Sequence, residues 1–376
     1  MVLTKQMLEE NEEVSLAFYA VKSSESLGRK FEEKIDDERL CFQRDKDRII
    51  HSKSFRRLEE KTQVFIAGSG DHYRTRLTHT LEVAQVARDI ARRLALNEDL
   101  CEAIALAHDL GHPPYGHGGE DALDEIMKEY DAHFEHNKQS RRIVEKMEKV
   151  YPDFDGLNLS HEVLDGMIKH QSAWDQAEMK FETSPHLEAQ VVNIADEIAY
   201  TNHDIDDGLR SGIITLGQLK GFYLWDEAVT QVEEKYGDDL DEQVLKARTV
   251  SRIISMMVKD FCEQTEKNIS SNQIKSVEEV RKHKGLLAHF SEDMQLRIKE
   301  LREFLYKNFY MSERISTFID DGKMMIKELF KFYMENPDKF PKEVENDEEY
   351  VITVKDYIAG MTDGFLQEEF NRVVGK

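Results

Sequence analysis

The chain has 376 residues, of which 51 are Lys or Arg and 75 are Asp or Glu, so its formal net charge is -24. A surface this acidic repels polyanions, which argues against bulk binding to nucleic acid but leaves room for a local basic pocket. Only six prolines and 19 glycines occur among many Leu, Ile, Glu and Lys residues, a composition that favours helices over sheets. We therefore predict an all-α protein.

Cysteine usage and the first residues bear on the compartment. Cys41, Cys101 and Cys262 are odd in number and form no CxxC pair, which is typical of free thiols in a reducing compartment. The start of the chain runs into an acidic stretch without the apolar segment of a secretory signal. No window approaches the roughly 20 apolar residues that cross a bilayer. We expect a cytoplasmic protein that does not contact a membrane.

Two helices are predicted before a His-rich segment. Apolar residues at spacings of three and four predict the first helix from Leu81 onward, namely Val83, Ala87, Ile90, Ala91 and Leu94. A second, short helix is predicted from Leu100 to about Gly111, because Pro113 and Pro114 cannot continue it.

The segment that follows is predicted as a loop, with further helices after it. Residues 115–119 are a loop by composition, and Glu120 then opens a helix, since acidic residues suit a helix N-terminus. Residues 187–206 are predicted as a helix that carries Asp196, Tyr200 and Asp204 on one face. Beyond residue 211 the pattern stays helical without a cluster of reactive side chains.

Four residues are candidate metal ligands. They are His79, the adjacent pair His108 and Asp109, and Asp196. Imidazole and carboxylate groups together suit a divalent ion such as Mn, Mg, Fe or Zn. Four such ligands leave positions open for water and a phosphate oxygen, which is typical of a catalytic metal site. A His-Asp pair alone is a weak signal, but this one opens the His- and Gly-rich segment HDLGHPPYGHGGE.

With these motifs the chain resembles the HD-domain phosphohydrolase superfamily, and within it the bacterial dGTP triphosphohydrolase-like branch. The resemblance rests on HDLGHPPYGHGGE, on FQRDKDRIIHSKSFRRLEEKTQVF (42–65), on RTRLTHTLEVAQVAR (74–88) and on ADEIAYTNHDIDDGL (195–209). It is thinner beyond residue 210, where YIAGMTDGF (357–365) is the main echo. It implies an HD-domain helical bundle over residues 41–210. An N-terminal helical arm (1–40) precedes the bundle, and a helical C-terminal region (211–376) completes the pocket and makes oligomer contacts.

The resemblance also implies a reaction and the residues that perform it. The substrate would be a deoxynucleoside triphosphate (dNTP), attacked at the α-phosphorus to give deoxynucleoside and tripolyphosphate. His117 would transfer a proton at the water or at the leaving 5′ oxygen, and Glu120 would orient His117. The cofactor would be a divalent metal ion, Mg or Mn, with Fe, Co, Ni and Zn as alternatives.

Further positions match substrate contacts of the family. Tyr200 and Asp204 correspond to sugar contacts, and Gln63 corresponds to the residue that reads the 3′ hydroxyl. The phosphate contacts would be Arg76, His112 and His136. One departure concerns the C-terminal motif, where Gly364 and Phe365 stand in place of the family's frequent Arg-Tyr, so the preferred nucleobase stays open.

Two other interpretations remain open. An HD phosphodiesterase acting on a cyclic dinucleotide or an alarmone would share the metal site, but the chain lacks a GYP-like signature. A nucleotide-sensing module would bind without turnover, and the pair His117 and Glu120 argues against it, because binding alone needs no acid-base pair. The resemblance further implies a homo-oligomer, a tetramer or hexamer, and leaves room for a dNTP effector.

Overall fold

The fold is helical, as the composition predicts. The structure, a computed structural model, describes residues 2–33, 38–63, 74–168, 183–342 and 347–375. Within these residues the only β-type pairings are isolated bridges, Arg29 with Ser160, Thr62 with Thr75 and Lys149 with Gly156. The predicted all-α fold is confirmed. The last two residues of the 42–65 motif, Val64 and Phe65, lie outside the described residues.

The chain forms two compact units, and each is built from separated segments. The first unit contains Met1–Asp47, Leu81–Leu106 and Leu159–Ser312. The second unit contains Arg48–Thr80, Ala107–Asn158 and Glu313–Lys376. The predicted division at residues 40 and 210 stays a prediction.

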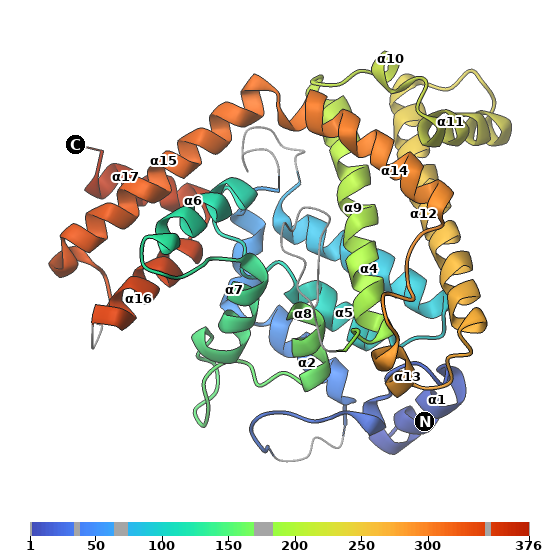
Figure 1. The fold of residues 1–376 in the computed structure, drawn as a ribbon, viewed down its shortest axis with the longest axis horizontal. Coiled ribbons are helices and arrows are strands. Elements are labelled where there is room, and N and C mark those ends of the chain that lie inside the picture. Colours follow the sequence, from blue (N-terminus) through green and yellow to red (C-terminus); the bar gives the residue numbers. More distant parts are fainter. Residues whose placement is uncertain (1, 34–37, 64–73, 169–182, 343–346, 376) are drawn as a thin grey trace. The chain divides into compact units, whose positions relative to one another are not determined.

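The first unit is organised around a long central helix, α9 (Leu187–Ser211), which packs against α8, α12 and α14 (Figure 1). Val191, Ala195 and Ile198 form its apolar stripe and are fully buried, as their spacing predicts. The other helices of this unit are α1 (Lys5–Ser15), α8 (His161–Ile168), α10 (Leu216–Leu219), α11 (Tyr223–Tyr236), α12 (Glu242–Ser271), α13 (Val277–Lys282) and α14 (Glu292–Leu305). A 3₁₀ turn (Ser23–Glu25) and a π-helical turn (Tyr306–Tyr310) complete it.

The second unit pairs the helix after the His-rich segment with the C-terminal helices. α6 (Gly116–Lys128) packs along α15 (Glu313–Glu335), and α15 also contacts α16 (Asp347–Ala359) and α17 (Asp363–Val373) (Figure 1). Leu123 and Ile126 share one apolar core with Ile326, Leu329 and Tyr333. The remaining helices and turns of this unit are α3 (Lys53–Arg57), α7 (His136–Arg142), the 3₁₀ turns Leu58–Glu60 and Pro337–Lys339, and the π-helical turn Ile143–Met147.

Three helices have residues in both units. They are α2 (Cys41–Ile50), α4 (Arg76–Arg93) and α5 (Glu98–Ala107). The two helices predicted before the His-rich segment correspond to α4 and α5. α4 begins five residues earlier than predicted, at Arg76, and therefore includes His79.

The predicted loop at 115–119 is wrong in part, because α6 begins at Gly116 rather than at Glu120. Tyr115 precedes the helix in the left-handed conformation, with φ of 63°. The glycines here serve close packing as well as the turn: a Cβ at Gly119 would lie 2.0 Å from the carbonyl oxygen of Pro114. His117 and Glu120 therefore stand three residues apart in the first turn of a helix.

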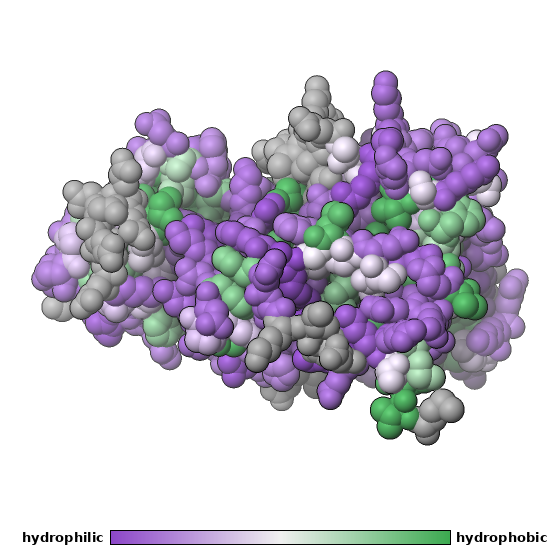
Figure 2. All heavy atoms as spheres, turned by 90° about the horizontal axis from the view of Figure 1, so that it is seen from below, coloured by the Kyte–Doolittle hydropathy of each residue, from purple (hydrophilic) through white to green (hydrophobic). Residues whose placement is uncertain are grey.

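The surface agrees with the charged composition. The face drawn in Figure 2 is mostly hydrophilic, and the apolar residues on it are scattered. Among the described residues, none of the helices combines the length and the hydropathy that a membrane span requires.

Candidate active site

Three of the four predicted metal ligands lie together in the second unit. His79 is on α4, while His108 and Asp109 directly follow the last residue of α5. Each offers one ligand atom, these atoms lie within 4.8 Å of one another, and all three residues are buried. His79 Nε2 lies 3.8 Å from Asp109 Oδ2, and His108 Nε2 lies 3.3 Å from Asp109 Oδ1. This arrangement can present two imidazoles and one carboxylate to a single cation.

The turn after α5 is held against α7. Ser140 Oγ donates a hydrogen bond to the carbonyl oxygen of His108 and accepts one from the backbone N–H of Gly111, both at 2.8 Å. Gly111 lies so close to α7 that a Cβ there would be 2.2 Å from the carbonyl oxygen of His136. Any other residue at position 111 would push the turn and α7 apart, so this glycine is required by packing.

Asp109 is ionised in spite of its burial. Burial alone would raise its pKa, but His108, His112 and Arg76 together hold the pKa of Asp109 well below its usual range. Arg76 Nη1 donates to Asp109 Oδ2 at 2.8 Å, and His112 Nδ1 lies 2.9 Å from Asp109 Oδ1. Arg76, predicted as a phosphate contact, is thus bonded to a candidate ligand; whether it also meets phosphate stays a prediction.

The donor set of this cluster fits a divalent metal. A buried ionised carboxylate beside two imidazoles is a ligand combination for ions such as Mn²⁺, Fe²⁺ or Zn²⁺. A buried carboxylate of this kind is stable only when positive charge compensates it. Arg76 supplies part of that charge, and a cation between His79, His108 and Asp109 would supply more.

A second group of polar residues surrounds Glu120. Its Oε1 accepts hydrogen bonds from the backbone N–H of His136 at 2.7 Å and faces His136 Nδ1 at 2.9 Å. Its Oε2 lies 3.4 Å from Nδ1 of the exposed His117. The rings of His112 and His136 stack with centroids 3.9 Å apart. The structure thus brings together all four residues predicted at this place, and their catalytic and phosphate-binding roles stay predictions.

The charges of this group follow from its contacts. Burial alone would raise the pKa of Glu120, but His136 and His117 bring the pKa well below its ordinary value, so Glu120 is a carboxylate. Burial, Arg76 and His136 lower the pKa of His112 well below its usual range, so His112 is neutral. The carboxylate of Glu120 can accept a hydrogen bond from His117 Nδ1 and so orient the ring.

Two residues that sequence reasoning missed position the His-rich segment. The carboxylate of Asp363 accepts the backbone N–H of Tyr115 at 3.0 Å and that of Thr62 at 2.8 Å. The buried Lys61 donates to the carbonyl oxygens of His112 and Ala359. Burial, followed by the nearby Arg76, lowers the pKa of Lys61 to about 7. Both residues lie in motifs of the family resemblance, Lys61 in the 42–65 segment and Asp363 in YIAGMTDGF, but neither motif indicated their role.

Gln63 lies beside this segment. A Cβ at Gly116 would be 3.8 Å from the carbonyl oxygen of Gln63 and 3.0 Å from Arg76 Nη2, which places the three residues close together. Within the described part of the chain, the buried side-chain oxygen of Gln63 receives no hydrogen bond. An acceptor in this state can take a hydrogen bond from a ligand, and the contact of Gln63 with a 3′ hydroxyl stays a prediction.

The remaining predicted residues are on α9, in the first unit. Asp196, Tyr200 and Asp204 are all buried and follow one another at intervals of four residues. Because Asp196 belongs to the other unit, its convergence with His79, His108 and Asp109 stays a prediction.

Two further residues that the sequence did not reveal contact this face of α9. Tyr310 lies in the π-helical turn after α14, and its hydroxyl donates a hydrogen bond to Asp204 Oδ2 at 2.5 Å. The guanidinium of Arg302 lies 5.0 Å from the Tyr200 ring centroid and pairs with Glu197. Both residues lie about 100 positions beyond α9 in the chain, and neither belongs to a recognisable motif.

Two domains of known families match the chain. The HD domain matches residues 76–201, and a phosphohydrolase-associated domain matches residues 288–372. Together with the helical fold and the His-Asp cluster, these matches define an HD-domain phosphohydrolase, a class that depends on metal.

Curated relatives then give the particular family. Proteins of Geobacter sulfurreducens and Leptospira interrogans are 45% and 41% identical to the chain, with coverage of 96% and 98% of both sequences. A protein of Bartonella quintana is 41% identical over 95% of both. Each of the three is called a deoxyguanosinetriphosphate triphosphohydrolase-like protein. The chain belongs to this family, and the resemblance drawn from the motifs is confirmed.

Proposed function

We propose that this protein hydrolyses dNTPs to deoxynucleoside and tripolyphosphate. The observation that carries the proposal is the juxtaposition, in one unit, of the buried cluster of His79, His108 and Asp109 with the pair His117 and Glu120. A metal ligand set can bind a phosphate-bearing substrate, and an exposed imidazole backed by a carboxylate can move a proton. The names of the relatives point to the same reaction.

The metal would be held by His79, His108, Asp109 and Asp196. When bound, the ion would polarise a phosphate oxygen and lower the pKa of water. Mg or Mn are the first expectations, with Fe, Co, Ni and Zn as alternatives. The carboxylate of Asp109 stays ionised because of Arg76 and His112, so it is ready to bind a cation at neutral pH.

The protein's own groups would then perform the proton transfers. Water attacks the α-phosphorus, the bond between phosphorus and the 5′ oxygen breaks, and the tripolyphosphate keeps the oxygen of the water. His117 would deliver a proton to the leaving 5′ oxygen from Nε2, because Glu120 contacts the ring at Nδ1. General acid catalysis of this kind contributes about 10²- to 10⁴-fold to the rate.

Specificity would come from residues around the two polar groups. His112, His136 and Arg76 would meet the phosphates, and the side-chain oxygen of Gln63, which receives no hydrogen bond among the described residues, would accept one from the 3′ hydroxyl. On α9, Tyr200 and Asp204 would contact the sugar. An aromatic ring near C2′ rejects ribonucleotides by steric exclusion, so dNTPs are the expected class.

A substrate panel tests the proposal. The four dNTPs and four rNTPs are incubated with the protein and Mg, Mn or Co in water labelled with heavy oxygen. We expect deoxynucleoside without label and tripolyphosphate with label, and much slower turnover of rNTPs. Release of pyrophosphate or monophosphate would contradict the proposed bond cleavage. Binding of dNTPs without turnover under every metal condition would favour the sensing module.

We also expect a cytoplasmic homo-oligomer, a tetramer or hexamer, and leave a dNTP effector as part of the proposal. Analytical ultracentrifugation at assay concentrations measures the oligomeric state, and a monomeric active species would contradict that part. Activity with one dNTP, measured with and without a second, tests the effector.

A further inference from the structure

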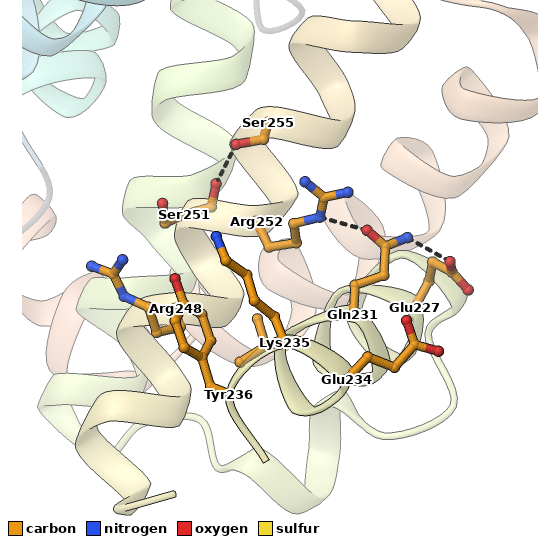
Figure 3. A pocket seen from close by; sticks show the side chains of 10 residues that line it. Glu227, Gln231, Glu234, Lys235, Tyr236, Arg248, Ser251, Arg252 and Ser255 are labelled. Atoms are coloured by element: carbon orange, nitrogen blue, oxygen red, sulfur yellow. Dashed lines mark hydrogen bonds between the residues drawn. The ribbon is translucent and has the colours of Figure 1, made fainter. Parts of the chain in front are cut away.

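A polar hollow outside the candidate active site lies between α11 and α12 of the first unit (Figure 3). Its volume is about 640 Å³, which is within the range of small-molecule sites, roughly 300–1,000 Å³. The lining that matters here consists of three cations and three hydroxyl groups, Lys235, Arg248, Arg252, Tyr236, Ser251 and Ser255. None of these residues belongs to the predicted site.

The cations of the hollow lack carboxylate partners. Within the described residues, neither Lys235 nor Arg248 nor Arg252 has an ion pair, although acidic residues outnumber basic ones 75 to 51 in the chain. Their neighbours behave differently: Lys246 pairs with Glu242 and Arg297 pairs with Asp293, both at 2.6 Å. The three cations are exposed and share the hollow with Glu227 and Glu234, yet in the described part of the chain none of the three is paired with a carboxylate, so their N–H donors are available to an anion.

The side chains on one side of the hollow converge. Lys235 Nζ lies 5.0 Å from the ring centroid of Tyr236. Hydrogen bonds from Lys235 and then from Arg248 lower the pKa of the Tyr236 hydroxyl, which indicates a positive local potential. Figure 3 shows Lys235, Tyr236 and Arg248 on this side of the hollow, below Ser251.

The opposite side is built differently. Arg252 Nε donates to the side-chain oxygen of Gln231, and Gln231 in turn donates to Glu227 at 2.6 Å (Figure 3). These two hydrogen bonds fix the guanidinium of Arg252 through Nε, and the N–H groups of its two terminal nitrogens remain available as donors. Glu227 and Glu234 repel anionic groups and accept N–H or O–H donors, so a bound anion is oriented toward Lys235 and Arg248.

We propose that this hollow binds a phosphate-bearing anion. Arginine and lysine donors combined with hydroxyl groups are the chemistry that recognises phosphate oxygens through charge-assisted hydrogen bonds. Free tripolyphosphate and the triphosphate of a nucleotide share that chemistry. In a nucleotide, the sugar or base donors would face Glu227. The inference goes beyond the proposed function and does not depend on it.

Calorimetric titration of the full chain tests the inference. The probes are inorganic tripolyphosphate, a non-hydrolysable dNTP analogue and a deoxynucleoside without phosphate. The double variant Lys235→Gln with Arg248→Gln is compared with a control that removes the same charge from paired cations of the same unit, Lys246→Gln with Arg210→Gln. We expect the hollow variant to lose one binding event or to weaken it by about 10-fold, which is 1.4 kcal/mol.

The variants and probes give different results for a real site and for none. Loss in the hollow variant but not in the control supports the site, and weakening of the same event by salt confirms its ionic character. Equal binding of tripolyphosphate and the analogue identifies the phosphates as the whole signal, while tighter binding of the analogue assigns a role to Glu227. Equal binding by wild type, hollow variant and control overturns the inference. Arg252→Gln, with thermal unfolding measured for all variants, gives the same test if the double variant does not fold.

Discussion

The two regions that carry predicted site residues are positioned by different means. Residues 107–120 include the His-rich turn. The backbone of this turn is held by the side chains of Lys61 and Asp363, which are far away in the sequence. On α9, by contrast, Asp196 and Asp204 share a face because of the helical repeat itself. The comparison teaches that the turn depends on distant residues for its geometry, whereas the helix face needs only its own hydrogen bonds. Substitutions outside each region should therefore have unequal effects.

The largest effect is expected within the turn itself, for Asp109→Asn. An amide is a poor substitute for the ionised carboxylate between His79, His108 and Arg76. Residues that only orient a metal ligand contribute about 10- to 100-fold to metal affinity or activity, so loss of a ligand should exceed that. Metal content after dialysis and kcat are measured. Asp121→Asn, which removes an exposed carboxylate of α6, is the matched control, and an equal loss there would contradict a ligand role for Asp109.

A large effect is also expected from a distant residue, Asp363→Ala. This change leaves the buried N–H groups of Tyr115 and Thr62 without their acceptor. We expect kcat to fall by about 10- to 100-fold and the free energy of unfolding by about 1–3 kcal/mol. Asp363→Asn keeps one carbonyl acceptor and should recover part of kcat. If kcat in both variants falls only in proportion to the fraction of folded protein, Asp363 has a purely structural role.

A smaller effect is expected from a residue that contacts α9, Tyr310→Phe. Asp204 loses one hydroxyl donor, but α9 continues to hold its carboxylate in place. We expect the free energy of unfolding to fall by about 1–2 kcal/mol. KM for a dNTP should rise by less than about 10-fold, with metal content unchanged. A collapse of kcat as deep as that of Asp363→Ala would show that the site residues on α9 depend on distant contacts as well.

The smallest effect concerns pH and Glu120. Its contacts with His136 and His117 lower its pKa below the ordinary 4.5, although burial opposes this. A carboxylate with a lowered pKa stabilises the fold above the ordinary value, and that stability is lost as the pH falls. Between about pH 5.5 and 3.5, wild type should lose about 1 kcal/mol more unfolding free energy than Glu120→Gln. Glu129→Gln, at the exposed residue that follows the same helix, should behave like wild type. Parallel curves for all three proteins would contradict the lowered pKa of Glu120.

The sequence predicted some parts of this protein well because they depend on local patterns. The apolar spacing of Val191, Ala195 and Ile198 predicted α9, and the HD motif predicted the neighbouring pair His108 and Asp109. The start of α6 was misplaced because glycines are read as loop residues, while here they serve close packing against Pro114.

Other parts could not be predicted because they depend on contacts between distant segments. In the sequence, Lys61 and Asp363 look like ordinary solvent-exposed charged residues. Only the folded chain brings them to the His-rich turn. The same holds for Tyr310, whose hydroxyl reaches Asp204 across 106 positions of sequence. Family resemblance located the YIAGMTDGF motif but did not explain it.

The division of the second unit into separated segments has a consequence for protein synthesis. The apolar side of α6, with Leu123 and Ile126, is covered by α15, which begins at Glu313. A ribosome makes α6 long before it makes α15, so the nascent chain carries this face uncovered over nearly 200 codons. The His-rich turn therefore acquires its final support only near the end of translation, and the growing chain depends on protection from proteases and from self-association until then.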